Sequence, residues 1–504
     1  MTLASRVLGF VRDVINAAVF GVGLGMDAFL VAFMIPNFMR RLFAEGAFSQ
    51  AFVPVFTETK TTQPQEALRQ LLSVVSGTLG GVLLLITLLG IAGAPLLLSV
   101  FAPGFGSEPG NAQLGTELLR ITFPYLMLIS LTAMVSGALN SHGQFAIPAL
   151  TPVLLNVCMI AAVWVNATSV KVLAWAVLLA GFLQLGFQLP ALARLGLLTR
   201  PRWGWNDPRV SRIVQLMLPI LFGSSVAQLS LLINTMLASL IPGNGSISWL
   251  YYADRVMEFP LGIFSIAIAT VILPSLSAQH AKKSTQDFSA TLDWGLRTLL
   301  IIGLPAMLGL FLLAGPLVTT LFHYSRFTAG DVEMTRVALM AYAFGFMGFS
   351  LVKILVPGFY ARQETRIPVR YGVIALMVGM VLSATLVWTL LQLHYFAPHV
   401  GLAISTSAVA CINAGLLFLR LKRDGTYSPQ PGWMAFSLRL LLAGLAMSAL
   451  VIWLAGDLGA WTTLGAGGRA LKMTGVVAAA AALYFASLWA SGLRPRHLRH
   501  SHSI

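Results

Sequence analysis

The feature that most constrains this chain is a series of apolar runs, each about 20 residues long and therefore long enough to span a bilayer core of roughly 30 Å as a helix. Charged residues make up 10% and apolar residues 57% of the 504 residues, whereas a soluble domain carries roughly 25% charged residues. The mean hydropathy is +0.82. We therefore predict an all-α polytopic membrane protein with about 14 transmembrane helices. The predicted spans are 2–22, 26–56, 68–101, 116–140, 147–166, 171–193, 210–241, 246–278, 291–322, 333–360, 367–393, 400–419, 433–455 and 470–491.

Basic residues between the predicted spans gather on one side of the membrane. The loops after even-numbered spans and the C-terminal tail hold Lys60, Arg69, Arg194, Arg200, Arg202, Arg209, Arg212, Lys282, Lys283, Arg362, Arg366, Arg420, Lys422, Arg423, Arg494, Arg496 and Arg499. The loops after odd-numbered spans hold little beyond Lys171 and Arg326. Because cytoplasmic loops carry the excess of Lys and Arg, this pattern predicts that both termini lie in the cytoplasm. The net charge of +15 then reflects membrane orientation, and no nucleic-acid partner is predicted.

Proline-containing motifs recur along the chain with a nearly constant offset. The pairs are Pro54 and Pro274, Pro95 and Pro316, and Pro148 and Pro368, which lie 220 or 221 residues apart. A constant offset at three separate places indicates an internal repeat, a common feature of transporters. We predict two pseudo-symmetric six-helix lobes, residues 1–200 and 201–424, and a C-terminal region, 425–504, with a helix pair and a basic cytoplasmic tail.

Charged residues inside the first two predicted spans are the first candidates for function. A charge near the centre of a bilayer costs roughly 2.5–3.5 kcal/mol on insertion scales and marks a functional site by default. Span one holds Arg6, Arg12 and Asp13, and span two holds Asp27 and Arg40. Arg6 and Asp13 project from nearly the same face of a helix. Arg12 lies about 100° around the helix from Asp13 and is predicted to face a different neighbour.

A second group of charges lies in span eight, in the sequence "YYADRVMEFP". Asp254 and Glu258 are four residues apart and Arg255 and Glu258 three apart, so all three can share one side of a helix. Such a side is not expected to face lipid, and we predict that it faces a cavity. Pro260 and Gly262 follow at once and predict a bend beside that cavity.

Purely structural roles remain open for each of these arginines. Arg40 and its neighbour Arg41 could anchor the helix at the interface or pair with Glu45, and Arg6 could reach the interface from the start of the chain. Arg12 and Arg255 lie deeper in apolar spans. An arginine-rich cavity favours an anion, most naturally phosphate, because a guanidinium makes bidentate contacts to phosphate oxygens. No P-loop sequence occurs and no metal-ligand spacing is present, so neither ATP hydrolysis by this chain, nor a metal, nor another cofactor is predicted.

Five sequence segments resemble the MurJ (MviN) family of lipid II flippases, which belongs to the MOP exporter superfamily. They are "SRVLGFVRD" (5–13), "DAFLVAFMIPNFMRRLFAEGAFSQAFVPVF" (27–56), "WLYYADRVMEFPLGIFSIAIATVILPSLS" (249–277), "VPGFYARQETRIPV" (356–369) and "PQPGWMAF" (429–436). The first three are long and highly specific. The resemblance runs from residue 1 to the C-terminal helices.

The resemblance implies a transporter, not an enzyme, with 14 helices and two lobes around a cationic cavity. Arg6, Arg12, Arg40 and Arg255 match the family's functional arginines, with Asp27 and Glu258 as acidic companions and Asp13 and Asp254 as further supporting carboxylates. By that similarity they would bind the pyrophosphate and disaccharide-peptide headgroup of lipid II. The helix pair 433–455 and 470–491 would form the groove for its undecaprenyl tail.

These expectations lead to an alternating-access hypothesis, in which the lipid II pyrophosphate engages Arg12 and Arg255 and the headgroup crosses to the periplasmic leaflet. The energy source could be the membrane potential, or a proton or other cation bound at Asp27 or Glu258. The alternatives are an exporter of another polyprenyl-linked saccharide or of a drug, a membrane glycosyltransferase, and a scaffold for cell-wall synthesis proteins. The predicted loop at 22–26 has no carboxylate, which disfavours the glycosyltransferase.

Overall fold

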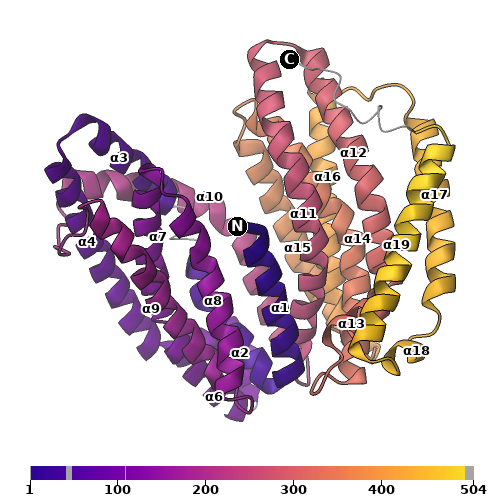
Figure 1. Ribbon diagram of the computed structural model, residues 1–504, viewed down its shortest axis with the longest axis horizontal. Helices are drawn as coiled ribbons and strands as arrows, with labels where there is room; N and C mark the ends of the chain where they lie inside the picture. The colour runs from indigo at the N-terminus through magenta and orange to yellow at the C-terminus, as the bar shows by residue number, and fades with distance from the viewer. Residues whose placement is uncertain (1, 41–47, 108, 494–504) are drawn as a thin grey trace. The chain divides into compact units, whose positions relative to one another are not determined.

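The computed structural model describes residues 2–40, 48–107 and 109–493, and these residues form helices and connecting loops without a β-strand (Figure 1). By packing, the chain divides into two compact units, residues 1–248 and 249–504. The all-helical prediction is confirmed. The predicted lobe boundaries at 200/201 and 424/425 stay predictions.

The first unit contains ten α-helices and one short 3-10 helix among its described residues. They are α1 (Thr2–Phe20), α2 (Leu24–Arg40), α3 (Ser49–Thr62), α4 (Gln65–Ala92), α5 (Ala94–Phe101), η2 (Pro103–Ser107), α6 (Pro109–Thr122), α7 (Tyr125–Ser141), α8 (Ala146–Val165), α9 (Lys171–Arg194) and α10 (Pro208–Ser239). A cluster of buried apolar side chains from α3, α4, α7 and α9 forms one core of this unit.

The second unit begins within the first turn of α11 and continues to the C-terminal helices. Its elements are α11 (Ser246–Ala281), α12 (Thr285–Leu312), α13 (Ala314–Phe322), α14 (Ala329–Tyr360), α15 (Arg366–Gln392), α16 (Val400–Arg423), α17 (Trp433–Ala455), α18 (Gly459–Thr462) and α19 (Ala466–Ala490). One core is shared by α11, α12, α14 and α16, and another by α12, α17 and α19.

Ten described helical segments, one of them (110–141) made of α6 and α7 together, are long and apolar enough to cross a membrane. They confirm a polytopic membrane protein, but they do not confirm the predicted number of 14. Four predicted spans form helices over most of their described residues without being among these ten: 2–22, 26–56, 210–241 and 246–278. Three of these four, 2–22, 26–56 and 246–278, hold the charged residues singled out above.

Several predicted spans are interrupted. The residues Gly90, Gly93 and Pro95 indicate that the run 68–101 can break, whereas single helices are expected for 116–140 and 291–322. Span 116–140 is divided between α6 and α7 at Pro124, which lacks the N–H that a continuous helix requires. Span 68–101 is divided at Gly93 into α4 and α5, and span 291–322 at Leu313 into α12 and α13. Span 26–56 comprises α2 and the start of α3, with 41–47 outside the described residues.

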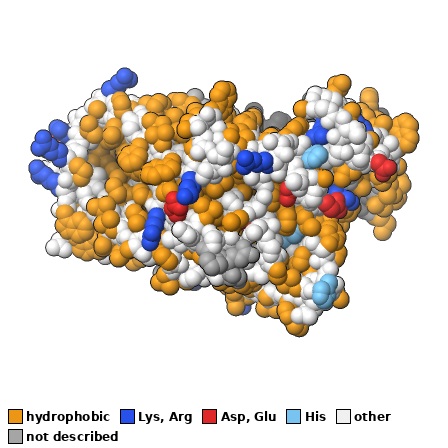
Figure 2. Space-filling model, turned by 90° about the horizontal axis from the view of Figure 1, so that it is seen from below, with side chains coloured by type: hydrophobic (Ala, Val, Ile, Leu, Met, Phe, Trp, Pro, Cys, Tyr) orange, Lys and Arg blue, Asp and Glu red, His pale blue; other side chains and the backbone are white. Residues whose placement is uncertain are grey.

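Exposed tryptophans lie near the ends of four of the helices. Trp164, Trp388, Trp453 and Trp489 are each at least 65% exposed, and each lies within four residues of a helix end. Tryptophan is enriched at the interface between bilayer and water, where its ring contacts lipid and its N–H contacts water. Figure 2 looks along the helices from below and shows Lys, Arg, Asp, Glu and His side chains among hydrophobic ones.

The helix boundaries repeat along the chain at the offset found in the sequence. The 28-residue helices α4 and α12 begin at Gln65 and Thr285, the short helices α5 and α13 at Ala94 and Ala314, and α8 and α15 at Ala146 and Arg366. Each pair of starting residues is 220 positions apart. The repeat therefore extends from the proline motifs to the lengths and interruptions of the helices.

The C-terminal helix pair is attached to α12 by a buried carboxylate. Asp293 of α12, 3% exposed, accepts hydrogen bonds from the Tyr427 hydroxyl at 2.8 Å and the Trp433 indole N–H at 2.7 Å. Its second oxygen pairs with Arg297 at 2.7 Å. Arg297 also donates to the carbonyl of Pro431 at 3.0 Å and lies over the Trp433 ring. This cluster fixes the connecting segment 424–432 and the start of α17.

Arg469 of α19 makes a second attachment at the opposite end of the pair. It is 6% exposed and donates to the carbonyls of Trp461, Thr462, Thr319 and His323, at 2.8 to 3.2 Å. These contacts join α19 to α13 and α18. Burial and the nearby Arg469 charge lower the pKa of His323.

Candidate functional site

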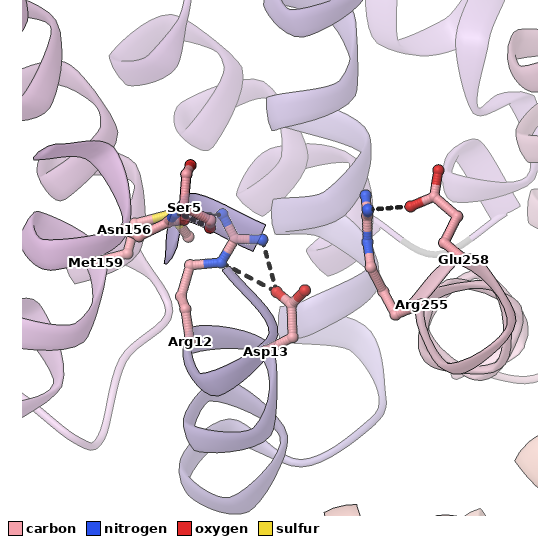
Figure 3. A network of polar contacts seen from close by, with 7 residues as sticks. All are labelled: Ser5, Arg12, Asp13, Asn156, Met159, Arg255 and Glu258. Atoms are coloured by element: carbon pink, nitrogen blue, oxygen red, sulfur yellow. Dashed lines mark hydrogen bonds and ion pairs between the residues drawn. The ribbon is translucent and has the colours of Figure 1, made fainter. Parts of the chain in front are cut away.

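Arg12 lies at the centre of a polar cluster in the first unit (Figure 3). Its Nη2 contacts Asp13 Oδ1 at 2.7 Å and its Nε contacts the same oxygen at 3.0 Å. Its Nη1 donates to Asn156 Oδ1 of α8 at 3.0 Å. Asp13 is 3% exposed, and the side chain of Arg12 is 11% exposed. The guanidinium is thus held from two sides while part of it remains accessible.

The prediction that Arg12 faces away from Asp13 is only half correct. The long arginine side chain turns around α1 and returns to its neighbour's carboxylate, while also reaching the separate helix α8. Asn156 was not predicted as a site residue. Its amide nitrogen donates to the Ser5 carbonyl at 3.2 Å, so it joins α8 to two points of α1. A polar residue in the apolar run of 147–166 was the only sequence signal for it.

Asp27 accepts hydrogen bonds at the start of α11, a contact that the sequence pattern did not predict. Its carboxylate receives the backbone N–H of Gly245 at 2.6 Å and of Ser248 at 2.8 Å, as well as the Ser248 hydroxyl. A carboxylate in this position satisfies unpaired helix N–H groups and is stabilised by the positive end of the helix dipole. Asp27 also borders a pocket of about 380 Å³, whose other polar side chains come from Asn111, Ser239 and Asn244.

The other two predicted arginines of the first unit are Arg6 of α1 and Arg40 of α2. Arg40 is the last residue of α2 and donates to Asn37 Oδ1 at 2.8 and 3.0 Å. The proposed partner Glu45 and the neighbouring Arg41 lie outside the described residues. Arg6 is exposed on α1.

Arg255 of α11 forms the corresponding pair in the second unit (Figure 3). Its Nη1 contacts Glu258 Oε2 at 2.5 Å, and its guanidinium lies 4.9 Å from the centre of the Tyr251 ring. The spacing of three residues had placed Arg255 and Glu258 on one helical side, and the structure agrees. The Arg255 side chain is 31% and that of Glu258 49% exposed, so both are accessible. Asp254, one residue earlier, is half-buried.

Each cluster offers an arginine that is positioned by a carboxylate and a polar or aromatic neighbour. A positioned guanidinium presents its N–H groups in a fixed fork, the geometry that suits phosphate oxygens. Within the described part of the chain, no group of three or more His, Cys, Asp or Glu side chains could hold a metal ion. The arrangement is therefore suited to binding an anion.

The fold and these charged helices define a polytopic, all-helical membrane protein with positioned arginines in its helices, the class to which transporters of the MOP superfamily belong. A solved structure of a multidrug resistance MATE family transporter of that superfamily, in an inward-facing conformation, covers 84% of this chain and 94% of its own, with a TM-score of 0.66 and 14% identity. This likeness concerns the fold alone.

The family model for the lipid II flippase MurJ matches residues 16–464. A probable lipid II flippase MurJ of Vibrio cholerae is 44% identical, over 99% of this chain and 96% of its own. The lipid II flippase MurJ of Burkholderia cenocepacia is 42% identical, over 99% and 97%. The solved structure of a lipid II flippase MurJ in an inward closed conformation has a TM-score of 0.79 over 97% of this chain and 98% of its own. The chain belongs to the MurJ family.

Proposed function

We propose that this protein is a flippase that moves lipid II, the undecaprenyl-pyrophosphate-linked precursor of peptidoglycan, from the cytoplasmic to the periplasmic leaflet. The observation that carries the proposal is the full-length similarity, at 44% identity, to a relative named a probable lipid II flippase. The polytopic helical fold and the positioned arginines suit a transporter of an anionic lipid rather than an enzyme. Lipid II is the proposed partner of the charged residues.

Arg12 and Arg255 are the proposed contacts of the lipid II pyrophosphate. Both side chains are partly exposed and each is held by a carboxylate, Asp13 or Glu258. A pyrophosphate oxygen that replaces a carboxylate oxygen gives the guanidinium an equivalent charged partner. Arg6 and Arg40 are proposed to contact the rest of the headgroup, with Asp27 and Asp254 as supporting carboxylates.

Further features of the transport cycle belong to the proposal. The protein works by alternating access in the bacterial inner membrane with both termini in the cytoplasm, since the basic loops follow the positive-inside rule. The apolar helices α17 and α19 provide the groove for the undecaprenyl tail, among other membrane lipids. The membrane potential or a cation supplies the energy, and cell-wall synthesis proteins are its candidate protein partners.

The alternative cargo is another polyprenyl-linked saccharide or a drug. The MATE transporter with a related fold favours no particular cargo, because at 14% identity it shares the fold alone. A cationic drug would meet like charge at Arg12 and Arg255, whereas a polyprenyl-linked saccharide would present the same pyrophosphate as lipid II. An experiment on the cargo must therefore identify which polyprenyl-linked lipid the protein transports.

The test is growth of a bacterium whose own lipid II flippase is depleted. We expect this chain to restore growth, and R12A and R255A to fail although they reach the membrane at normal levels. R69A is a matched control, because Arg69 is 46% exposed in an i,i+3 pair with Glu66 on α4. Normal growth with both R12A and R255A would refute the role of the arginines. A well-inserted chain that restores no growth would point to a different polyprenyl-linked cargo.

A further inference from the structure

The segment between α9 and α10 does not form a free loop but follows the surface of α4. The backbone N–H of Arg202 donates to the Ser73 carbonyl at 2.8 Å, and the Ser73 hydroxyl donates to the Arg200 carbonyl at 2.6 Å. Two residues on, the N–H of Gly204 donates to the Thr78 hydroxyl at 3.0 Å. The backbone groups of the segment therefore form hydrogen bonds with side chains and a carbonyl of α4.

Two glycines of α4 allow this close approach. A Cβ atom on Gly77 would lie 2.2 Å from the Arg202 carbonyl oxygen, and one on Gly81 would lie 2.7 Å from the ring of Trp203. The first of these distances involves backbone atoms, so no side-chain movement could relieve it. The positions of Arg202 and Trp203 on α4 are thus fixed by packing as well as by hydrogen bonds.

The contacted part of α4 lies at the boundary between its polar and apolar ends. The first turns of the helix carry the exposed pair Glu66 and Arg69. Farther along, Leu84, Leu85, Leu88 and Leu89 are each at least 48% exposed, as expected for side chains that contact lipid. At a rise of about 1.5 Å per residue, the segment lies between these two regions, where a bilayer places its headgroups and glycerol groups.

The segment presents arginine and tryptophan side chains at this depth. Trp203 and Trp205 are 65% and 51% exposed, and their rings stack at 6.3 Å with an angle of 16°. Arg200 and Arg202 are exposed, and neither has a carboxylate within 4.0 Å among the described residues. Their neighbours differ, since Arg209 pairs with Asp207 and Arg212 with Glu58.

We propose that residues 200–205 form a binding site for an anionic phospholipid of the surrounding bilayer. Arg200 and Arg202 hold its phosphate, and the stacked Trp203 and Trp205 contact its glycerol and the upper part of its acyl chains. The two arginines select a headgroup with a net negative charge. A zwitterionic headgroup carries its own cation, which neutralises the phosphate that the arginines would bind. This site requires only that the chain is embedded in a membrane and does not depend on which lipid the protein transports.

The experiment measures fluorescence of the purified full-length protein in nanodiscs containing phosphatidylglycerol or phosphatidylcholine with brominated acyl chains, which quench nearby tryptophans. The signal of the site is the difference between the wild-type protein and W203F/W205F. We expect half-maximal quenching of that signal at a roughly 25-fold lower fraction of brominated phosphatidylglycerol than of brominated phosphatidylcholine, since the site has two arginines and each basic residue near an anionic surface strengthens the attraction roughly fivefold.

In R200Q/R202Q this preference should fall to less than about twofold, with unchanged thermal stability. The control K282Q/K283Q removes the same charge from a loop of the second unit, and should retain the preference. Equal quenching by the two lipids in the wild-type protein would overturn the proposal. A preference for phosphatidylglycerol that persists in R200Q/R202Q would overturn it as well. So would a preference that is as large in the total fluorescence of W203F/W205F as in that of the wild-type protein.

Discussion

Arg12 shows how a single residue can keep a charge within an apolar helix. Asp13 compensates the charge and Asn156 accepts a further N–H, while 11% of the side chain remains exposed. A lysine ammonium lacks the planar fork that reaches Asp13 and Asn156 at once. We therefore regard the guanidinium, and not only its charge, as the functional group.

Asn156 provides a direct test of this arrangement. N156L preserves the approximate size of the side chain but removes the acceptor for Arg12 and the donor to Ser5. Loss of a hydrogen bond to a charged group weakens the arrangement by about 1.5–3 kcal/mol, so we expect flippase activity to fall by at least about tenfold. The measurement is lipid II exposed outside a flippase-depleted cell that expresses the variant. C158A, in the same helix, should behave as wild type, and normal activity of N156L would contradict the role given to Asn156.

His399 makes stability depend on pH. It is 1% exposed and immediately precedes α16, where burial lowers its pKa from 6.5 to about 4 although Nε2 contacts the Met334 carbonyl. Above pH 6.5 the imidazole is neutral in both folded and unfolded protein. As the pH falls from 6.5 to 4 the unfolded chain binds the proton first, so folding loses up to roughly 3 kcal/mol.

The measurement for His399 is the thermal unfolding midpoint of the detergent-solubilised protein between pH 7.5 and 5. The midpoint of the wild-type protein should fall more steeply with acidification than that of H399Q, which has no titrating group at this position. Parallel curves for the two proteins would show that His399 is not buried as a neutral imidazole.

At the scale of helices, the attachment of α17 to α12 depends on Asp293. Removing this carboxylate leaves Arg297 without its partner and Tyr427 and Trp433 without their acceptor. Burial, followed by the hydrogen bond to Asp293, raises the pKa of Tyr427, so the phenol remains a donor. Asp293 is thus the acceptor that the two aromatic side chains share.

We expect D293A to lower the free energy of unfolding by about 2–4 kcal/mol, because it breaks a largely buried ion pair. Y427F removes one hydrogen bond of the same cluster and should cost only about 1 kcal/mol. Thermal unfolding of both variants in detergent gives the comparison. If D293A proved no less stable than Y427F, Asp293 would not be the centre of this attachment.

The sequence predicted the positions of most helices well but most of the interruptions within them poorly. The apolar runs located α8, α9, α15, α16, α17 and α19 to within a few residues. The break between α6 and α7 was missed because apolar residues on both sides of Pro124 continue the run. The site shows the same division. Arg255 and Glu258 were predictable from spacing within one helix, whereas the contacts of Asn156, Asp27 and Asp293 join residues far apart in the chain.

At the scale of the whole molecule, the internal repeat links the sequence to the fold. The offset of 220 residues that separates the proline motifs also separates the starts of α4 and α12, with the same length of 28 residues. The charged clusters do not repeat in this way, because Arg12 and Asp13 lie in the first helix and Arg255 and Glu258 in α11. The internal repeat therefore extends over the scaffold and does not include the two arginine clusters.

The most direct test of the central claim is the exposure of lipid II on the outer side of the inner membrane. A cell depleted of its own lipid II flippase is supplied with this chain, and an external probe that modifies only outward-facing lipid II reports the exposed fraction. We predict that the wild-type chain restores this fraction, and that R12A and R255A, inserted at equal levels, leave it at the depleted value. A wild-type chain that inserts fully and exposes no lipid II would contradict the account.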